Sequence, residues 1–177
     1  KLRRRNDVAG ILCDMWSALG GQCVAAHWPQ SSASLTATMG PACTLANGRE
    51  VDCILMGFAD EGTDLAIDVS VCCSDAMKSG TFADGIAERE RKKVGWYTGE
   101  VSKIPGLSFS PFVLGSRGGF GRAARRVWMQ FLKHAKERCA ADWRHSWSAR
   151  SFGEVWIQKL SAAMANRAAV GAMLRAP

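Results

Sequence analysis

The chain has 177 residues and a net charge of +7, from 23 lysines and arginines against 16 aspartates and glutamates. This length suffices for one domain with its own hydrophobic core, so a single domain over residues 1–177 is predicted. The hydrophobic content of 47% is typical of a globular protein. The chain contains no run of about eighteen apolar residues, so no membrane-spanning helix is predicted. Because the chain begins with Lys1, we expect a fragment of a longer polypeptide, whose upstream part is a candidate partner.

Positive charge is concentrated in the last third of the chain. From Gly115 onward there are 12 lysines and arginines against 3 acids, whereas the preceding residues carry 11 against 13. A basic region of this kind suits a polyanionic ligand. Solubility, or binding to an acidic protein, is the alternative explanation.

The seven cysteines are odd in number and include no C-x-x-C pair. This pattern excludes a secreted disulfide framework and the spacing of a zinc finger. Thiols in a reducing compartment are the preferred interpretation, which places the protein inside the cell, and we expect it in the nucleus. Cys139 with His134 and His145 as part of a metal site is the alternative.

The first third of the chain predicts a helix, a short strand and a loop. Apolar residues at helical spacing predict a helix over Asp7–Leu19, with Asn6 as its N-cap and Gly20-Gly21 as its end. A short strand over Gln22–His27 and a loop over Pro29–Asn47 follow.

Two strands joined by a short turn come next. They are Val51–Met56, which contains Asp52, and Asp64–Val71, which contains Asp68. The intervening Ala59–Thr63 has the composition of a hairpin turn, so the two strands are expected to pair antiparallel and to bring the two acids close together.

The second of these strands alternates strictly. Leu65, Ile67, Val69 and Val71 face one way, while Asp64, Ala66, Asp68 and Ser70 face the other. The first face is predicted to be core. The second presents carboxylates, and a half-exposed strand with a solvated acidic face is the alternative.

A helix predicted over Ala83–Tyr97 carries a polar stripe. Glu90, Lys93 and Tyr97 lie at offsets of three and seven residues, so they share one face. An ordinary charged helix with intrahelical ion pairs is the alternative.

After this helix, the chain predicts a third strand and two more helices. The strand Ser108–Leu114 is separated from Asp64–Val71 by a helix, so a parallel crossover is expected. The fold class is therefore α/β, a small mixed sheet flanked by helices. A basic helix over Ala123–Arg138 and a C-terminal helix over Phe152–Leu174, which acts as a cover, complete it.

A glycine-rich turn, Gly115 to Arg122, opens the basic helix. It lacks the Gly-Lys-Ser/Thr ending of a Walker loop. A turn at a helix N-terminus exposes backbone N–H groups, so we predict a phosphate clamp formed with nearby arginines. The candidate nucleic-acid-binding residues are Arg117, Arg122, Arg125 and Arg126. A simple strand-to-helix turn is the alternative.

These motifs together resemble the PD-(D/E)XK, or restriction-endonuclease-like, nuclease superfamily. The closer likeness is to the C-terminal endonuclease domains of non-LTR retrotransposon proteins. It is carried by Asp52, by Ile67-Asp68-Val69-Ser70-Val71 and by Glu90-Arg91-Lys92-Lys93-Val94-Gly95-Trp96-Tyr97, and is extended by Arg5-Asn6-Asp7, Phe109-Ser110-Pro111 and Gly118-Gly119-Phe120-Gly121. Val51 stands where the family has proline, and Ser70 where it has lysine. Lys93 matches the position to which some members move that lysine.

The resemblance implies a restriction-endonuclease-like core and a divalent-metal-dependent DNA endonuclease that nicks a target site for a retroelement. Asp52 and Asp68 would hold Mg²⁺ or Mn²⁺, Lys93 would act on the attacking water or the phosphate, and Glu90 would support the metal shell or Lys93. Asp7 and Asp14 are further candidate metal ligands.

Two other functions stay open. A catalytically inert nucleic-acid-binding module on the same fold would keep the basic surface without the metal. A protein-interaction domain would have solvated acids and a basic face that docks an acidic partner. The first function requires Asp52, Asp68 and Lys93 to converge.

Overall fold

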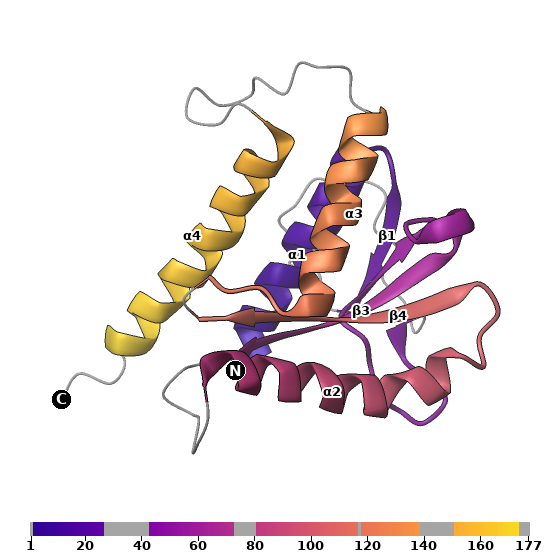
Figure 1. Cartoon of the computed structure of the whole chain (residues 1–177), viewed down its shortest axis with the longest axis horizontal. Coiled ribbons are helices and arrows are strands. Elements are labelled where there is room, and N and C mark those ends of the chain that lie inside the picture. The colour runs from indigo at the N-terminus through magenta and orange to yellow at the C-terminus, as the bar shows by residue number, and fades with distance from the viewer. Residues whose placement is uncertain (1, 27–42, 73–80, 117, 139–150, 174–177) are drawn as a thin grey trace.

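A computed structural model describes residues 2–26, 43–72, 81–116, 118–138 and 151–173. In this part of the chain, four α-helices and four strands form an α/β fold (Figure 1). In chain order these are α1 (Leu2–Ala18), β1 (Gln22–Ala25), β2 (Cys53–Met56), β3 (Asp64–Cys72), α2 (Phe82–Val101), β4 (Leu107–Gly115), α3 (Arg122–Arg138) and α4 (Phe152–Met173).

The four strands form one mixed sheet in the order β1-β2-β3-β4. The β1–β2 and β2–β3 pairs are antiparallel, and β3 and β4 are parallel. A one-turn 3-10 helix, Asp60–Gly62, lies in the connection between β2 and β3. The predicted hairpin and the predicted crossover through a helix are therefore both confirmed.

The helices cover the two faces of the sheet unequally. Figure 1 shows α2 on one face and α1, α3 and α4 on the other. This division follows from connectivity: α2 crosses from β3 to its parallel neighbour β4 on one face, and α3, which follows β4, packs on the opposite face.

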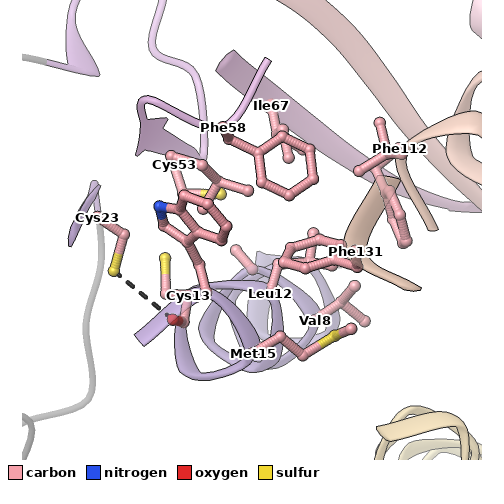
Figure 2. Packing of buried hydrophobic residues seen from close by; sticks show 14 of the residues in the cluster. Val8, Leu12, Cys13, Met15, Cys23, Cys53, Phe58, Ile67, Phe112 and Phe131 are labelled. Carbon is pink, nitrogen blue, oxygen red and sulfur yellow. Dashed lines mark hydrogen bonds between the residues drawn. The ribbon is translucent and has the colours of Figure 1, made fainter. Parts of the chain in front are cut away.

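The larger core cluster lies on the face covered by three helices. Its centre is aromatic. Trp16 from α1 meets Phe58 edge-on at 5.0 Å between ring centroids. The Phe131 ring from α3 lies 4.5 Å from the Phe58 ring, and Figure 2 labels both. Ile67 and Val69 of β3 face this cluster, as the alternation predicts, whereas Ala66 belongs to a smaller cluster with Tyr97 of α2.

Some element boundaries differ from those predicted. α1 begins at Leu2, so Asn6 lies inside the helix and is not its N-cap. The reason is that leucine and arginine, which precede Asn6, are good helix formers and nothing there interrupts the helix. β2 begins at Cys53, so Asp52 directly precedes the strand. His27 and most of the predicted loop over residues 29–47 lie outside the described residues.

The helix that carries the polar stripe begins with a capping box. The Thr81 side chain accepts a hydrogen bond from the Asp84 N–H, and the Asp84 side chain accepts one from the Thr81 N–H. This reciprocal pair satisfies two N–H groups at the helix start. It places the start of α2 at Phe82, one residue earlier than predicted.

Within the described ranges, no helix combines the length and the apolar character that crossing a membrane requires.

Replacing Gly21 with alanine is expected to destabilise the fold, because the added carbon would lie 2.1 Å from the Trp16 indole. Trp16 is buried and its Nε1 donates a hydrogen bond to the Met56 carbonyl oxygen (3.0 Å), so the ring has no free direction in which to move. Urea denaturation should show a loss of about 1–3 kcal/mol in unfolding free energy.

The matched control is Gly95→Ala on α2, where nothing lies within 4 Å of the added carbon. It should leave the unfolding free energy unchanged or raise it by up to about 1 kcal/mol, because alanine is the better helix former. Equal effects at Gly21 and Gly95 would contradict the packing described for Trp16.

Candidate active site

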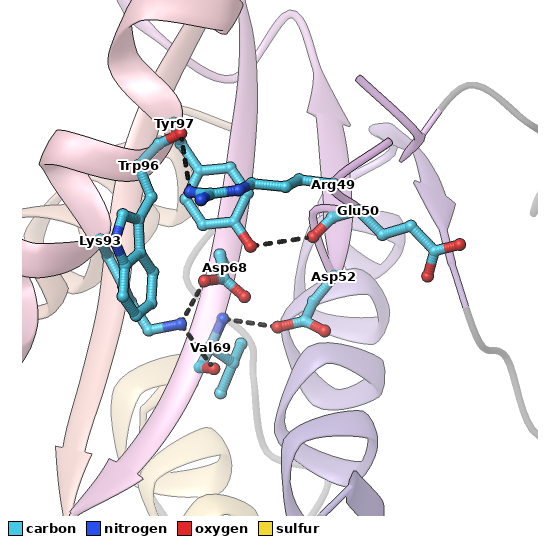
Figure 3. A network of polar contacts seen from close by, with 8 residues as sticks. All are labelled: Arg49, Glu50, Asp52, Asp68, Val69, Lys93, Trp96 and Tyr97. Carbon is cyan, nitrogen blue, oxygen red and sulfur yellow. Dashed lines mark hydrogen bonds and ion pairs between the residues drawn. The ribbon is translucent and has the colours of Figure 1, made fainter. Parts of the chain in front are cut away.

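Asp68 and Lys93 form a buried ion pair between the sheet and α2. Asp68 lies on the face of β3 that α2 covers, and its carboxylate pairs with the Lys93 ammonium (Figure 3). Asp68 is 1% exposed and Lys93 is 5% exposed. The acidic face of β3 is thus not solvated at Asp68, which rules out the simple alternative of a surface acid.

Asp52 reaches the same place from the start of β2. Its backbone N–H donates to the Ile67 carbonyl oxygen (2.8 Å), which fixes it beside β3. Its Oδ2 atom accepts a hydrogen bond from the Val69 N–H (2.6 Å), and the residue is 6% exposed. A carboxylate that accepts a backbone N–H bond can remain buried at a much lower cost than one without partners.

The three predicted groups therefore meet around one residue of β3. Lys93 Nζ donates to the Val69 carbonyl oxygen (3.3 Å), while the N–H of Val69 donates to Asp52. Asp68, the residue before Val69, holds the same ammonium. Asp52, at the start of β2, and Lys93, on α2, thus bond to the two consecutive peptide units of β3 that flank Val69.

Small side chains on β3 leave space for the lysine. The nearest β3 residues on the face of Asp68, two positions away on either side, are Ala66 and Ser70. One helical turn beyond Lys93, the Tyr97 ring stacks on Phe109 at 5.0 Å, and its hydroxyl donates to the Glu50 carbonyl oxygen (3.1 Å). Tyr97 thus packs and contacts the backbone, which fixes the position of α2 along the sheet.

Arg49 and Trp96, which are also drawn in Figure 3, form a contact that sequence reasoning did not single out. The Arg49 guanidinium lies 5.5 Å from the centre of the Trp96 ring, and its Nη1 donates to the Trp96 carbonyl oxygen (3.3 Å). Trp96 is 45% exposed. The contact joins residues 47 positions apart, so no local pattern signals it.

Glu90 has a different partner from Lys93. Its Oε1 atom accepts a hydrogen bond from the Ala123 N–H (2.8 Å), at the first turn of α3. A carboxylate at this position satisfies a helix N–H group and interacts favourably with the helix dipole. Glu90 thus connects α2 to α3, and its catalytic role stays a prediction.

The donor set fits a hard divalent cation in ligand type. Asp52 and Asp68 supply carboxylate oxygens and Val69 supplies a carbonyl oxygen, which are the ligand types that Mg²⁺ takes in proteins, usually with several waters. Among the residues that the structure describes, no group of three or more His, Cys, Asp or Glu side chains gathers. Asp52 and Asp68 are the two carboxylates that the described residues bring to this place.

Asp14, a further candidate ligand, lies elsewhere. Burial raises the pKa of Asp14, and the nearby Lys159 ammonium lowers it. Lys159 belongs to α4, on the face of the sheet opposite α2. Asp14 therefore lies across the sheet from Lys93. The role of Asp7 as a metal ligand stays a prediction.

Several N–H groups in the glycine-rich turn and in the first turn of α3 donate to acceptors within the protein. Gly118 N–H donates to Gly115, Gly121 N–H to Val113, and Ala123 N–H to Glu90. These three N–H groups already have acceptors within the protein, and the predicted phosphate clamp stays a prediction.

The described arginine side chains of the predicted clamp are exposed, unlike the bonded N–H groups of the turn. Arg122, Arg125 and Arg126 are exposed and line a groove beside α3. Arg117 lies outside the described residues.

Cys139 and His145 also lie outside the described residues, so the alternative metal site at them is untested. The third member, His134, contacts the Phe58 carbonyl oxygen through Nε2 (2.8 Å).

The five described cysteines are free thiols, as predicted. Burial raises the pKa of Cys43 to about 11, which keeps that thiol protonated and unreactive at neutral pH.

No protein-family model matches the chain, and no curated protein matches it either.

Replacing Lys93 with methionine is expected to destabilise the protein strongly, because Asp68 would keep a buried charge without its ammonium partner. The expected loss is about 3–5 kcal/mol of unfolding free energy, measured by urea denaturation. The double variant Asp68→Asn/Lys93→Met should recover part of this loss, because it also removes the buried charge.

Lys92→Met is the matched control for this experiment. Lys92 pairs with Glu88 (2.6 Å), but both side chains are more than half exposed, so little or no change in unfolding free energy is expected. A Lys93→Met protein as stable as Lys92→Met would contradict the buried ion pair.

Glu90→Ala is expected to cost about 1 kcal/mol of unfolding free energy, because it removes the acceptor of the Ala123 N–H. Glu90→Gln keeps an oxygen at the same place and should cost less. Thermal and urea unfolding of both variants measure the difference. Identical losses in the two variants would show that the acceptor at Ala123 is not what matters.

Proposed function

We propose that this chain is a divalent-metal-dependent DNA endonuclease with a restriction-endonuclease-like core, related to the endonuclease domains of non-LTR retrotransposon proteins. One observation carries the proposal: Lys93, from the helix after the acid strand, reaches Asp68 and the Val69 carbonyl beside Asp52. The family resemblance requires a lysine that is displaced to this helix to lie at this position, beside the two acids. A retroelement's target site as substrate, and the nucleus as its location, belong to the same proposal.

Each group would have a separate role. Asp52 and Asp68 would hold Mg²⁺ or Mn²⁺, which when bound lowers the pKa of a coordinated water and polarises the scissile phosphate. Lys93 would orient the attacking water or offset the negative charge that develops on the phosphate. The Val69 peptide unit would keep Asp52 and Lys93 in fixed positions relative to Asp68.

The inert nucleic-acid-binding module remains the second candidate, and burial is the observation that favours it. Asp68 and Lys93 are 1% and 5% exposed and neutralise each other. A site that hydrolyses DNA must admit water and a phosphate. Catalysis would therefore require Lys93 to exchange its contact with Asp68 for one with water or phosphate, whereas an inert module would keep the pair as a structural link.

Nicking of supercoiled plasmid DNA in Mg²⁺, Mn²⁺ or EDTA tests the proposal. The wild-type chain should nick in either metal and not in EDTA. Asp52→Asn, Asp68→Asn and Lys93→Met should each lower the nicking rate about 100-fold or more, because each removes a ligand or the charge at the reacting phosphate. Circular dichroism at the assay temperature must show that every variant is folded.

Lys92→Met controls for loss of a positive charge on the same helix and should nick at close to the wild-type rate. Loss of nicking in the aspartate variants alone would keep the endonuclease and remove Lys93 from it. Absence of nicking in all conditions, with DNA binding retained, would overturn the endonuclease in favour of the inert module.

A further inference from the structure

A basic groove of about 730 Å³ runs between α3 and the edge strand β4. Its positive charges come from one helix: Arg122, Arg125, Arg126 and Lys133 all line it. Ser110 of β4 and Gln130 of α3 add uncharged polar groups. Asp60 is the one acid among the described residues that line the groove, so positive charge dominates it.

The four cations form a line and not a cluster. They occur at offsets of 0, 3, 4 and 11 residues, which places them on one face of α3. A helix rises about 1.5 Å per residue, so Arg122 and Lys133 lie roughly 16 Å apart along its axis. A strand of nucleic acid carries regularly spaced phosphates over such a length, so a linear polyanion matches this row better than a single anion does.

The four cationic side chains project from an exposed helix surface. Arg122, Arg125, Arg126 and Lys133 are exposed, and in the described part of the chain none of them takes part in an ion pair. Arginine presents a planar fork of donors that matches phosphate oxygens. The row can therefore bind phosphates without first breaking ion pairs with described residues.

The groove lies on the opposite face of the sheet from the acid–lysine site, which is formed by Asp52, Asp68 and Lys93. Ser110 is paired with Ile67, and both occupy the alternate positions that face α3. Asp68 is paired with Pro111, one position further, so both face α2. Figure 1 shows α2 and α3 on the two sides of the sheet, with β4 between them. The same phosphates cannot contact the groove and Lys93 at once.

We propose that this groove is an anchoring site for the phosphate backbone of DNA, separate from the acid–lysine site and independent of any metal. The inference rests on the proposed function for its choice of DNA as the polyanion. A DNA strand held along α3 would have to pass around the β4 edge to reach the opposite face. Binding and cleavage should therefore be separable by mutation.

The test is binding of fluorescein-labelled single-stranded and duplex DNA in EDTA, followed by anisotropy over a range of NaCl concentrations. Arg125→Ala/Arg126→Ala should weaken binding about 10-fold or more and lower the slope of log K against log[salt] by about 1–2 for the form of DNA that is bound.

Arg91→Ala/Lys92→Ala is the matched control, since it removes the same charge from exposed positions on α2. Affinity and salt slope close to wild type in this control would support the groove. Equal weakening by both pairs, no weakening by the groove pair, or DNA binding that salt does not affect would overturn it. If the wild type binds through the groove but never nicks, the endonuclease fails and the anchoring site stands.

Discussion

The buried ion pair between Asp68 and Lys93 is the interaction on which the arrangement of this molecule most depends. A carboxylate and an ammonium removed from water each lose several kcal/mol of solvation, which only close pairing and further hydrogen bonds offset. Here the ammonium also donates to the Val69 carbonyl oxygen (3.3 Å). The pair therefore holds α2 to β3 at one register, because sliding the helix by one residue would separate two buried charges.

Other contacts of α2 extend this constraint to the rest of the sheet. Tyr97 donates to the Glu50 carbonyl oxygen (3.1 Å) just before Asp52, and Glu90 accepts the Ala123 N–H (2.8 Å) at the start of α3. The helix thus connects the entry to β2, the middle of β3 and the first turn of α3. The result is a site whose candidate groups come from three elements, and a basic helix that the same contacts position on the other face.

Sequence patterns predicted the elements well because they depend on local periodicity. The alternation in Asp64–Val71 predicted which residues face the core, since side chains of a strand point to opposite faces in turn. The offsets in Glu90, Lys93 and Tyr97 predicted a shared helix face for the same kind of reason. The N-cap was wrong because a cap depends on where the helix starts, and the residues before Asn6 are equally able to be helical.

Local sequence patterns were enough to predict the α/β pattern, the antiparallel hairpin, the parallel crossover and the candidates Asp52, Asp68 and Lys93. The partners of the side chains could be found only from the packing of the whole fold. Glu90, Lys93 and Tyr97 share one face of α2 but contact three different elements, because side-chain contacts depend on what packs against that face. The same packing places the arginine row across the sheet from Asp68. The periodicity within a helix does not indicate which face of the sheet that helix covers. For α2 and α3, the face follows from the path of the chain, which enters β4 from α2 on one side and leaves it to α3 on the other.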